Sequence, residues 1–518
     1  MTRTSADISR GLADARPAVP ISPGTRIHVL GVGGAASSGA ALHAAAVGAR
    51  VTGCDAGGAD PLTGAVLAAG IDIDWHNDPA HVRDTRGVAV VDRLAVTKAV
   101  TSVQPDHPEL LAAQSVGIVP ESVQQVIADA AETGGRRLIG VTGTHGKSTT
   151  SGWILHLLTT AGLDPSGFVG AALPASIAGP QRGVARIGTG PDFVVEADEY
   201  AGNFDPYRPD IAVLVSAEWD HPDVFASEDA VVATFADWIA RLTPGPRGMP
   251  TLVANAGDNG VARVLDALDG WTGRRVLVRL EAAGPDQATP VGDATLVGRI
   301  IGEDRDGTDL EITGLHGAAT GPDRVRIPLI GRHMAIDALM AAGGALAAGV
   351  DADAILRGLA SYEGVGRRFE LKGEVDGVTV LDDYAHHPTA MHLTFGAARQ
   401  RYPGRRLWAV YEPLTYHRTA AMLDRFADVL AEADRAAIID IWAVRDPDTT
   451  ITSAAALAAA TSARSRIPAV ATGSPEASAA WLADQVEPGD VVLVMGGGRS
   501  YVAAEQLVER LRARRIPS

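Results

Sequence analysis

The fold is decided by the stretch Arg137-Leu-Ile-Gly-Val-Thr-Gly-Thr-His-Gly-Lys-Ser-Thr149. Its apolar first part, 137–141, predicts a buried strand, and a helical pattern continues to Thr160. The glycines between them allow a turn that directs backbone N–H groups and the positive helix end at an anion. We therefore expect a P-loop-type phosphate site in which Lys147 reaches the β- and γ-phosphates of ATP and Ser148 is a ligand of Mg²⁺.

The candidate ATP-binding residues of this loop are Gly143, Thr144, His145, Gly146, Lys147, Ser148 and Thr149. The spacing differs from the standard P-loop, whose first glycine would fall at Val141. A glycine-rich turn without a ligand is the alternative interpretation.

Two acidic motifs follow later strands of the same predicted sheet. Glu196-Ala-Asp-Glu-Tyr200 comes after the apolar run 193–195, and Glu218-Trp-Asp-His-Pro222 comes after 211–215. Ligands of open α/β sheets bind at the carboxyl ends of the strands, so these motifs should lie beside the phosphate loop. Either motif alone reads as a solvated acidic turn, whereas the two together predict a divalent metal site.

An N-terminal βαβ unit precedes this domain. A strand at 26–30 runs into Gly31-Val-Gly-Gly-Ala35, a helix at 36–48 and a strand at 50–53, with Asp55 placed 24 residues after Gly31. This pattern is typical of a dinucleotide-binding turn and predicts an anionic group, a diphosphate, at the helix terminus. Close strand–helix packing through glycine is the alternative. A further strand is expected at 87–91.

A third α/β unit carries another polar group of residues. Gly366-Arg-Arg-Phe-Glu370 precedes a strand, and Asp382-Asp-Tyr-Ala-His-His-Pro388 follows it. Cations, acids and imidazoles are thereby predicted at one edge of a third sheet.

The fold class is α/β with three consecutive domains. Residues 1–25 are expected to be a disordered leader, and 26–134 a Rossmann-like domain. Residues 135–362 are expected to form a central P-loop-type ATPase domain with a parallel sheet and a small antiparallel appendage over 270–330. Residues 363–518 are expected to form a C-terminal Rossmann-like α/β domain.

Composition limits the functional classes. With 45 Lys and Arg against 62 Asp and Glu in 518 residues, the net charge of −17 disfavours a nucleic-acid-binding protein. No apolar run reaches the roughly 18–20 residues of a membrane helix, so no membrane association is expected. Cys54 is the single cysteine and cannot form an internal disulfide, which favours a reducing, cytoplasmic location. The oligomeric state is not indicated.

Taken together, these motifs resemble those of the Mur ligase family of peptidoglycan synthesis, in order over residues 26–518. The motif at 382–388 is highly specific to the muramate-ligase branch. The resemblance implies an ATP- and Mg²⁺-dependent amide ligase that joins an amino acid, L-alanine favoured, to UDP-N-acetylmuramate through an acyl phosphate. It also implies that the first domain binds the UDP-sugar, the second ATP, and the third the amino acid while closing over ATP.

The resemblance further implies roles for individual residues. The implied catalytic residues are Lys147, Glu196, His221 and His387. The implied metal ligands are Ser148, Glu196 and His221, and Arg368 and Asp383 join the ATP-binding set. The implied UDP-sugar-binding residues are Gly31, Gly33, Gly34, Ala35, Ser38, Asp55 and His76. The implied amino-acid-binding residues are Tyr384, His387 and Arg418.

Three positions depart from the family pattern. Met334 and Asp337 stand where the family has asparagines that hold adenine, and Leu414 replaces a histidine near the amino-acid site. A murein tripeptide recycling ligase, a ligase for another amino acid, and a catalytically degenerate nucleotide-binding relative therefore stay open. A nicotinamide-dependent oxidoreductase would explain the N-terminal glycines but not the Lys147 loop.

Overall fold

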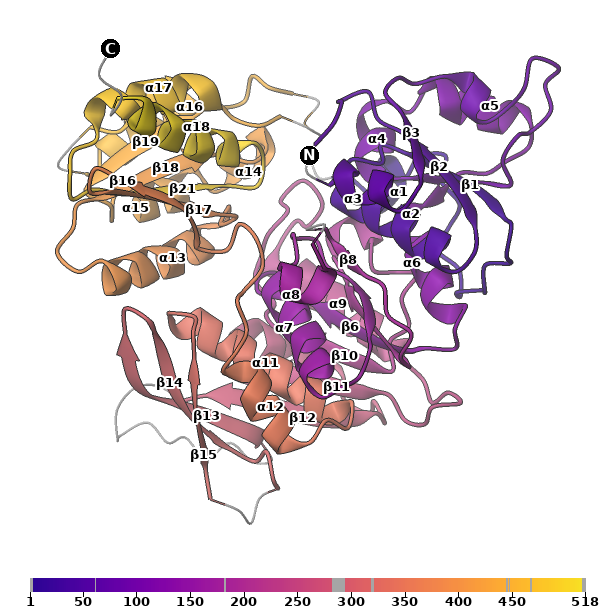
Figure 1. Cartoon of the computed structure of the whole chain (residues 1–518), viewed down its shortest axis with the longest axis horizontal. Coiled ribbons are helices and arrows are strands. Elements are labelled where there is room, and N and C mark those ends of the chain that lie inside the picture. The colour runs from indigo at the N-terminus through magenta and orange to yellow at the C-terminus, as the bar shows by residue number, and fades with distance from the viewer. Residues whose placement is uncertain are drawn as a thin grey trace.

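Three α/β domains follow one another along the chain in the computed structural model (Figure 1). The structure describes residues 3–60, 62–180, 183–281, 294–317, 321–443, 446, 448–465 and 468–514. The three domains and their mixed α/β character confirm the predicted fold class. The first and C-terminal domains lie side by side against one end of the central domain, and the β13–β15 extension of the central sheet projects from the other end.

The first domain has a five-stranded parallel sheet in the order β3-β2-β1-β4-β5. Its strands are β1 (Arg26–Leu30), β2 (Arg50–Cys54), β3 (Asp72–Asp74), β4 (Arg93–Val96) and β5 (Glu121–Ser122). Its helices are α1 (Ser5–Ile8), α2 (Ala35–Ala46), α3 (Thr63–Ala68), η1 (Pro79–His81), α4 (Lys98–Val103), α5 (Pro108–Ser115) and α6 (Val123–Glu132). Strand β1, the glycine turn and α2 lie where the sequence predicts them.

The prediction of a strand at 87–91 is wrong, because the next strand after β3 is β4 (Arg93–Val96), further along the chain. Asp84 closes a turn with the residues that follow it. Its side chain accepts hydrogen bonds from the backbone N–H groups of Arg86 and Val88, each at 2.9 Å, and Gly87 has a φ of 78°. The apolar run therefore leads out of a turn before the chain enters the sheet.

The prediction of a disordered leader is also wrong, since residues 3–25 include helix α1 and are anchored to the rest of the protein by a few side chains. Ile8 and Ile21 are buried, and Arg16 forms an ion pair of 2.7 Å with Asp129 of α6. The Asp129 carboxylate is fully buried and also pairs with Arg93. A buried carboxylate requires such partners, so the leader neutralises a charge within the first domain.

The central domain has a ten-stranded sheet in the order β15-β14-β13-β12-β11-β10-β6-β9-β7-β8. Its strands are β6 (Arg137–Thr142), β7 (Ser166–Phe168), β8 (Ala185–Arg186), β9 (Asp192–Glu196), β10 (Ile211–Leu214), β11 (Thr251–Asn255), β12 (Arg274–Leu280), β13 (Ala294–Asp304), β14 (Gly307–Thr313) and β15 (Asp323–Ile327). Its helices are α7 (Lys147–Thr160), α8 (Ala175–Ala178), η2 (Tyr200–Gly202), α9 (Glu228–Ala240), α10 (Asn259–Ala267), α11 (Arg332–Ala347) and α12 (Ala352–Leu359).

The expected antiparallel appendage is smaller than predicted and continuous with the main sheet. Strand β12 pairs in parallel with both β11 and β13, so it belongs to the parallel part. Only the β13–β14 and β14–β15 pairs at that edge are antiparallel. Alternating short runs in the sequence do not distinguish the two pairing directions, because both expose alternate side chains.

The C-terminal domain has a six-stranded sheet in the order β16-β17-β21-β18-β19-β20, in which only β16 pairs antiparallel. Its strands are β16 (Glu370–Val375), β17 (Val378–Asp383), β18 (Leu407–Glu412), β19 (Arg435–Ile439), β20 (Val470–Gly473) and β21 (Val491–Gly496). Its helices are α13 (Pro388–Arg401), α14 (Tyr416–Ala421), α15 (Leu423–Leu430), α16 (Ala454–Ser462), α17 (Pro475–Gln485) and α18 (Ser500–Ala513).

The phosphate loop is supported by a buried core. Helix α7 carries Trp153 and Leu157 into the interior with no exposed surface, and α11 adds Ala338 and Leu339 to the same cluster. This packing holds the N-terminus of α7 rigidly at the edge of the sheet.

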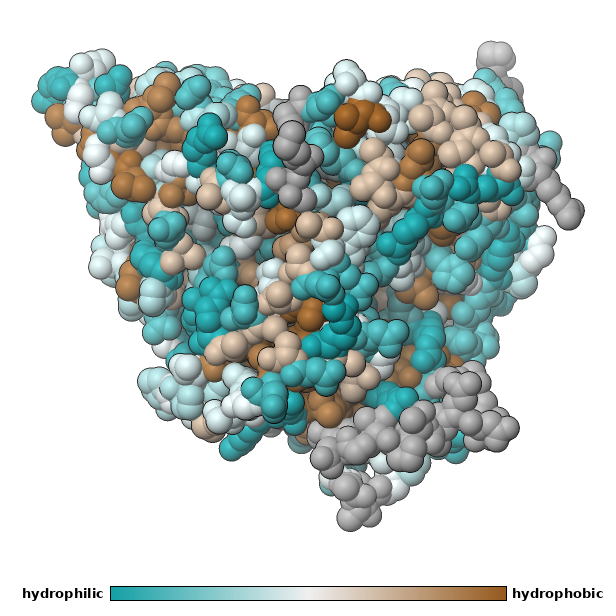
Figure 2. All heavy atoms as spheres, turned by 180° about the vertical axis from the view of Figure 1, so that it is seen from behind, coloured by the Kyte–Doolittle hydropathy of each residue, from teal (hydrophilic) through white to brown (hydrophobic). Residues whose placement is uncertain are grey.

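Seen from behind, the described surface shows hydrophobic residues dispersed among hydrophilic ones (Figure 2). Within the described ranges, every helix is too short or too polar to cross a bilayer.

Candidate active site

A cavity of about 1380 Å³ lies where the three domains meet. It is lined by Ala35 of the first domain, by the phosphate loop and the acidic motifs of the central domain, and by Tyr384 of the C-terminal domain. Among the predicted site residues, its lining includes Ala35, Thr144, His145, Gly146, Lys147, Ser148, Thr149, Glu196, His221, Arg368, Asp383, Tyr384 and His387. The domains therefore share one site.

The phosphate loop depends on two glycines in conformations that other residues avoid. Gly143 has a φ of 138°, and a Cβ there would lie 2.8 Å from the backbone nitrogen of Ser216. Gly146 has a φ of 80°, and its Cβ would lie 2.4 Å from Oδ1 of Asp337. The loop is thus shaped by close approach on both sides.

Lys147, the first residue of α7, points back across this loop. Its Nζ donates to the Gly143 carbonyl at 2.6 Å and to Oε2 of Glu199 at 2.9 Å, and Asp198 lies 3.8 Å away. Burial alone would lower the pKa of Lys147, but these carboxylates raise it above its ordinary value. The lysine is consequently charged at neutral pH and able to hold a phosphate.

Ser148 and Glu196 supply a suitable oxygen donor set for Mg²⁺. The Ser148 hydroxyl donates to Oε1 of Glu196 at 3.0 Å, and the other carboxylate oxygen accepts the backbone N–H of Gly170 at 2.6 Å. A hydroxyl and a fixed carboxylate beside a phosphate loop are ligands that Mg²⁺ prefers. This chemistry fits the predicted metal.

His221 lies in a neighbouring cluster with Asp198 and Glu199. One potential ligand atom from each of the three lies within 4.8 Å of the others, and His221 Nε2 is 3.9 Å from Oε1 of Glu199. His221 has a φ of 52°, an uncommon backbone conformation that directs its ring into the cavity region. Asp198 and Glu199 belong to the acidic motif at 196–200, but neither is among the site residues predicted from the sequence.

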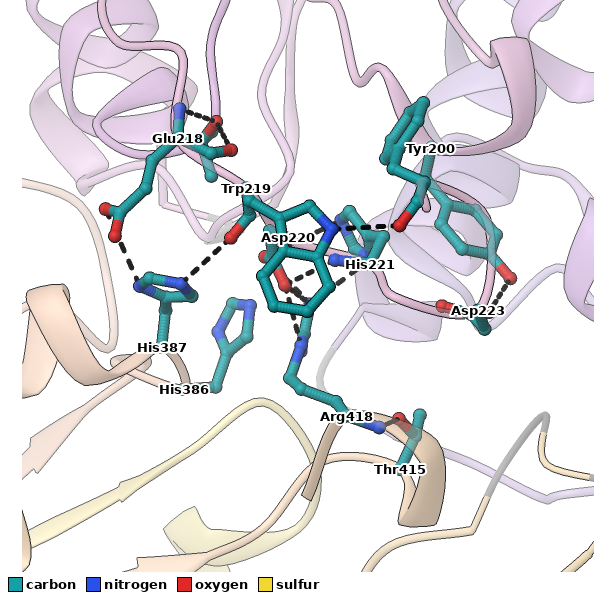
Figure 3. A network of polar contacts seen from close by, with 12 residues as sticks. Tyr200, Glu218, Trp219, Asp220, His221, Asp223, His386, His387, Thr415 and Arg418 are labelled. Atoms are coloured by element: carbon teal, nitrogen blue, oxygen red, sulfur yellow. Dashed lines mark hydrogen bonds and ion pairs between the residues drawn. The ribbon is translucent and has the colours of Figure 1, made fainter. Parts of the chain in front are cut away.

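The central and C-terminal domains are joined by buried polar contacts beside this cluster (Figure 3). Arg418 donates from Nε and Nη2 to the two oxygens of Asp220, each at 2.8 Å, and its Nη2 lies 3.2 Å from Nδ1 of His221. Burial would raise the pKa of Asp220, but Arg418 holds it well below its usual range. Arg418 does not line the cavity, so its predicted contact with the amino acid stays a prediction.

His387 uses both ring nitrogens at the same domain boundary. Its Nδ1 accepts the backbone N–H of Thr389 at the start of α13, and its Nε2 lies 3.3 Å from the Trp219 carbonyl. Burial lowers its pKa to about 4, so the ring is neutral. Figure 3 shows Glu218 and His387 facing each other across this boundary. The geometry thus places His387 in domain docking, and its catalytic role stays a prediction.

The C-terminal motif presents Arg368 to the phosphate loop. Both oxygens of Asp383 accept backbone N–H groups of the adjoining loops, including that of Phe369 at 2.7 Å. The Arg368 guanidinium lies 5.2 Å from the Tyr384 ring centroid, and its Nη2 is 3.5 Å from the Ser148 hydroxyl. Its Nε is buried without a hydrogen-bond partner among the described residues. Asp383 therefore shapes the turn, and Arg368 retains a free donor for a phosphate.

The departures at the predicted adenine site also lie at the cavity. Met334 and Asp337 both line it, from the first turns of α11. Burial raises the pKa of Asp337 to about 8. A protonated carboxyl combines an O–H donor with a carbonyl acceptor, and an asparagine amide combines an NH₂ donor group with a carbonyl acceptor, so Asp337 supplies similar hydrogen-bonding groups at neutral pH.

The first-domain residues divide into two groups. Gly33 donates its N–H to Oδ2 of Asp55 at 2.8 Å, and Ser38 donates to two backbone carbonyls, so these side chains shape the glycine turn. Ala35 reaches the cavity, with Gly31 and Gly34 in the turn before it. His76 is exposed, pairs with Asp74 at 2.5 Å and lies outside the cavity lining. The turn is thus assembled as predicted, whereas His76 is not brought to it.

Residues that the sequence did not single out complete the site. Glu218 binds His145 at 3.1 Å and Thr389 at 2.8 Å, and His386 lines the cavity with a pKa that burial holds well below its usual range. Glu218 and His386 both belong to motifs that the sequence predicts to lie at the site. Their individual roles depend on contacts with residues far along the chain, which no local pattern reveals.

Comparison with known families gives three matches in chain order. Residues 26–134 match the Mur ligase family catalytic domain, 141–345 the Mur ligase middle domain, and 367–498 the Mur ligase glutamate ligase domain.

Curated relatives match over most of their length. The UDP-N-acetylmuramate–L-alanine ligase of Kineococcus radiotolerans is 36% identical over 491 residues, covering 94% of this chain and 97% of the relative. The enzyme of that name from Mycolicibacterium smegmatis is 34% identical, covering 94% and 95%.

Solved structures share the fold. The UDP-N-acetylmuramate–alanine ligase of Thermotoga maritima superposes with a TM-score of 0.73 at 20% identity, covering 95% of this chain and all of that one. A murein peptide ligase of Psychrobacter arcticus gives 0.67 at 22% identity, covering 96% and 100%. The MurF ligase of Thermotoga maritima in complex with ADP gives 0.56 at 18% identity, covering 82% and 90%.

Proposed function

The chain belongs to the Mur ligase family, and from this premise we propose that it joins L-alanine to the lactyl carboxylate of UDP-N-acetylmuramate at the expense of ATP. The reaction makes a precursor of peptidoglycan. The relatives with this name align over nearly their whole length, which supports the same substrates here. The ATP requirement, the buried free Cys54 and the family support a cytoplasmic location.

The observation that carries the proposal is the convergence of three domains on the cavity around Lys147. The phosphate loop, the oxygen donors Ser148 and Glu196, and Arg368 from the C-terminal domain all lie on its wall. Such an arrangement binds a triphosphate and holds a carboxylate in line with its terminal phosphorus.

The residues of the chain then act in sequence. Lys147 and Arg368 neutralise charge on the γ-phosphate while a lactyl carboxylate oxygen attacks its phosphorus. The bond from this phosphorus to ADP breaks, which yields an acyl phosphate and ADP. The neutral amine of L-alanine attacks the acyl carbon, the carbon–oxygen bond to phosphate breaks, and the amine proton passes to the departing phosphate. Docking of the C-terminal domain through Arg418 excludes water that would hydrolyse the acyl phosphate.

Ser148, Glu196 and the cluster of Asp198, Glu199 and His221 would hold Mg²⁺. When bound, Mg²⁺ supplies positive charge that withdraws electron density from the phosphate oxygens. Most of these groups are oxygen donors, whose chemistry suits a hard cation, and His221 adds one nitrogen.

The test is phosphate release by the full chain with ATP, Mg²⁺ and UDP-N-acetylmuramate against a panel of L-alanine, L-serine, glycine and the murein tripeptide. We expect release to depend on both the UDP-sugar and L-alanine. Preference for the tripeptide would instead indicate a recycling ligase. If none of the acceptors in the panel supported phosphate release, the proposal would be overturned. The variant Lys147→Ala should lower kcat/KM by about 10²–10³. Arg86→Ala, which removes an exposed cation paired with Asp84 outside the cavity lining, should change it little.

A further inference from the structure

The first domain contains a buried cluster of four potential metal ligands outside the active-site cavity. His28, Cys54, His81 and Glu109 each offer one ligand atom, and these atoms lie within 4.8 Å of one another. None of the four belongs to the cavity lining. The proposed ligase reaction gives this cluster no task.

Four separate elements bring the side chains together. His28 lies in β1 and Cys54 ends the neighbouring parallel strand β2, while His81 ends η1 and Glu109 stands in the first turn of α5. The sheet and the helices that cover it therefore meet at this point.

The donor atoms have the separations of a tetrahedral zinc site. His28 Nε2 lies 3.3 Å from Cys54 Sγ and 3.3 Å from Glu109 Oε2. Glu109 Oε1 lies 3.2 Å from Cys54 Sγ and 3.0 Å from His81 Nδ1. Zinc–nitrogen and zinc–sulfur bonds of ordinary length place tetrahedral ligand atoms about 3.3–3.7 Å apart. One ligand atom from each of the four residues lies within 4.8 Å of the others, so small side-chain movements bring the four to these separations.

Each histidine is also held by its other ring nitrogen. His28 Nδ1 lies 2.8 Å from the Thr52 hydroxyl, and His81 Nε2 lies 3.1 Å from Oδ2 of Asp74. Metal-binding histidines characteristically engage a hydroxyl, carbonyl or carboxylate through the nitrogen that does not bind the metal. These partners leave His28 Nε2 and His81 Nδ1 directed at the cluster.

The charge balance also suits a zinc ion. Cys54 and Glu109 have no exposed surface and His28 is 1% exposed, so a charge here must be compensated locally. A thiolate and a carboxylate neutralise Zn²⁺, and the two imidazoles bind it without adding charge. On binding, the thiol proton that Cys54 now directs at Glu109 leaves to solvent, and the Zn–S bond takes its place.

We propose that His28, Cys54, His81 and Glu109 form a closed tetrahedral Zn²⁺ site that stabilises the first domain. Four protein ligands leave no open position, which is typical of a structural site rather than a catalytic one. The ion would tie η1 and α5 to β1 and β2. Cys54 directly precedes Asp55, whose carboxylate holds the N–H of Gly33, so the site also fixes the base of the glycine turn.

The single cysteine permits a decisive spectroscopic test. The purified full chain is stripped with a chelator, titrated with Co²⁺ and examined for a thiolate-to-cobalt charge-transfer band. Because Cys54 is the only cysteine, cobalt at the active-site carboxylates cannot produce this band. We expect the band to saturate at one Co²⁺ per chain, to be displaced by Zn²⁺, and to be accompanied by a higher unfolding temperature.

Variants locate the site. Cys54→Ser should abolish the band, and Glu109→Gln should weaken Zn²⁺ binding at least tenfold, with circular dichroism confirming that each variant folds. His392→Ala is the control, since His392 is exposed and pairs with Glu432 in the C-terminal domain, so its band should persist. Absence of the band in the unmodified chain, with an unfolding temperature insensitive to Zn²⁺, would show that the cluster is a hydrogen-bonded network only and would overturn the proposal. That result would leave the ligase assay unaffected.

Discussion

Arg418 of the C-terminal domain holds Asp220 of the central domain by two hydrogen bonds of 2.8 Å between buried side chains. The same guanidinium lies 3.2 Å from Nδ1 of His221, which belongs to the cluster beside Lys147. One arginine therefore connects closure of the C-terminal domain to the orientation of a candidate metal ligand.

Replacing this arginine should open the domain boundary. Arg418→Ala leaves the buried Asp220 carboxylate without its counter-charge, which costs about 3–5 kcal/mol. We expect kcat to fall by at least about a hundredfold, since each 1.4 kcal/mol is tenfold, and small-angle X-ray scattering to show a more extended chain. Arg425→Ala removes a partly exposed pair with Glu218 across the same boundary and should lower kcat less than about threefold. Equal effects of the two substitutions would contradict this assignment.

Gly146 tests the shape of the phosphate loop. In Gly146→Ala the new Cβ meets Oδ1 of Asp337 at 2.4 Å, so we expect ATP binding measured by calorimetry to be lost. Gly162→Ala is the matched control, because Gly162 has a φ of 77° and open space around its Cβ. Both variants store backbone strain of about 1–2 kcal/mol and should unfold at lower temperature. Only the first should lose ATP, and retained binding there would show that the loop accepts a side chain.

Glu196 tests the proposed Mg²⁺ donors. Glu196→Gln keeps the shape of the side chain but removes its charge beside Ser148, so the Mg²⁺ concentration for half-maximal activity should rise about tenfold or more. Glu432→Gln makes the same change at an exposed residue that pairs with His392 and does not line the cavity, and its Mg²⁺ dependence should match the parent chain. An unchanged Mg²⁺ requirement in Glu196→Gln would remove this residue from the donor set.

The sequence predicted those parts of the site whose signal is local. Strand β6, the glycine loop and α7 lie where the pattern at 137–160 predicts them, because apolar runs and a glycine turn determine local structure directly. Arg418 and Asp220 are 198 positions apart, and nothing near either residue reveals the other. Charged residues on a loop look alike whether they bind substrate or another domain.

The leader and the proposed zinc site were missed for related reasons. Residues 3–25 are mostly polar, but Arg16 has a buried partner in Asp129 that composition does not reveal. His28, Cys54 and Glu109 come from separate elements without a short metal-binding spacing, so only the sheet register and helix packing bring them together. Such contacts are properties of the tertiary structure.

Asp337 gives the pH dependence a definite sign. Burial raises its pKa from 3.8 to about 8, so the folded protein holds a proton between these values that the unfolded chain releases. Its contribution to stability is therefore largest at low pH and declines as pH rises to about 8. Above that value the side chain becomes an anion beside the phosphate loop, which should oppose ATP binding.

We expect the KM for ATP to rise about tenfold between pH 7 and pH 9, since only the neutral form binds well and its share falls tenfold per unit above the pKa. Asp337→Asn keeps a neutral donor and acceptor at every pH and should flatten this rise, while also flattening the decline in unfolding temperature. The control is Asp351→Asn, because Asp351 caps α12 on another face of the domain and does not line the cavity. A KM that rises equally in the parent chain and in Asp337→Asn would assign the titration to a different group.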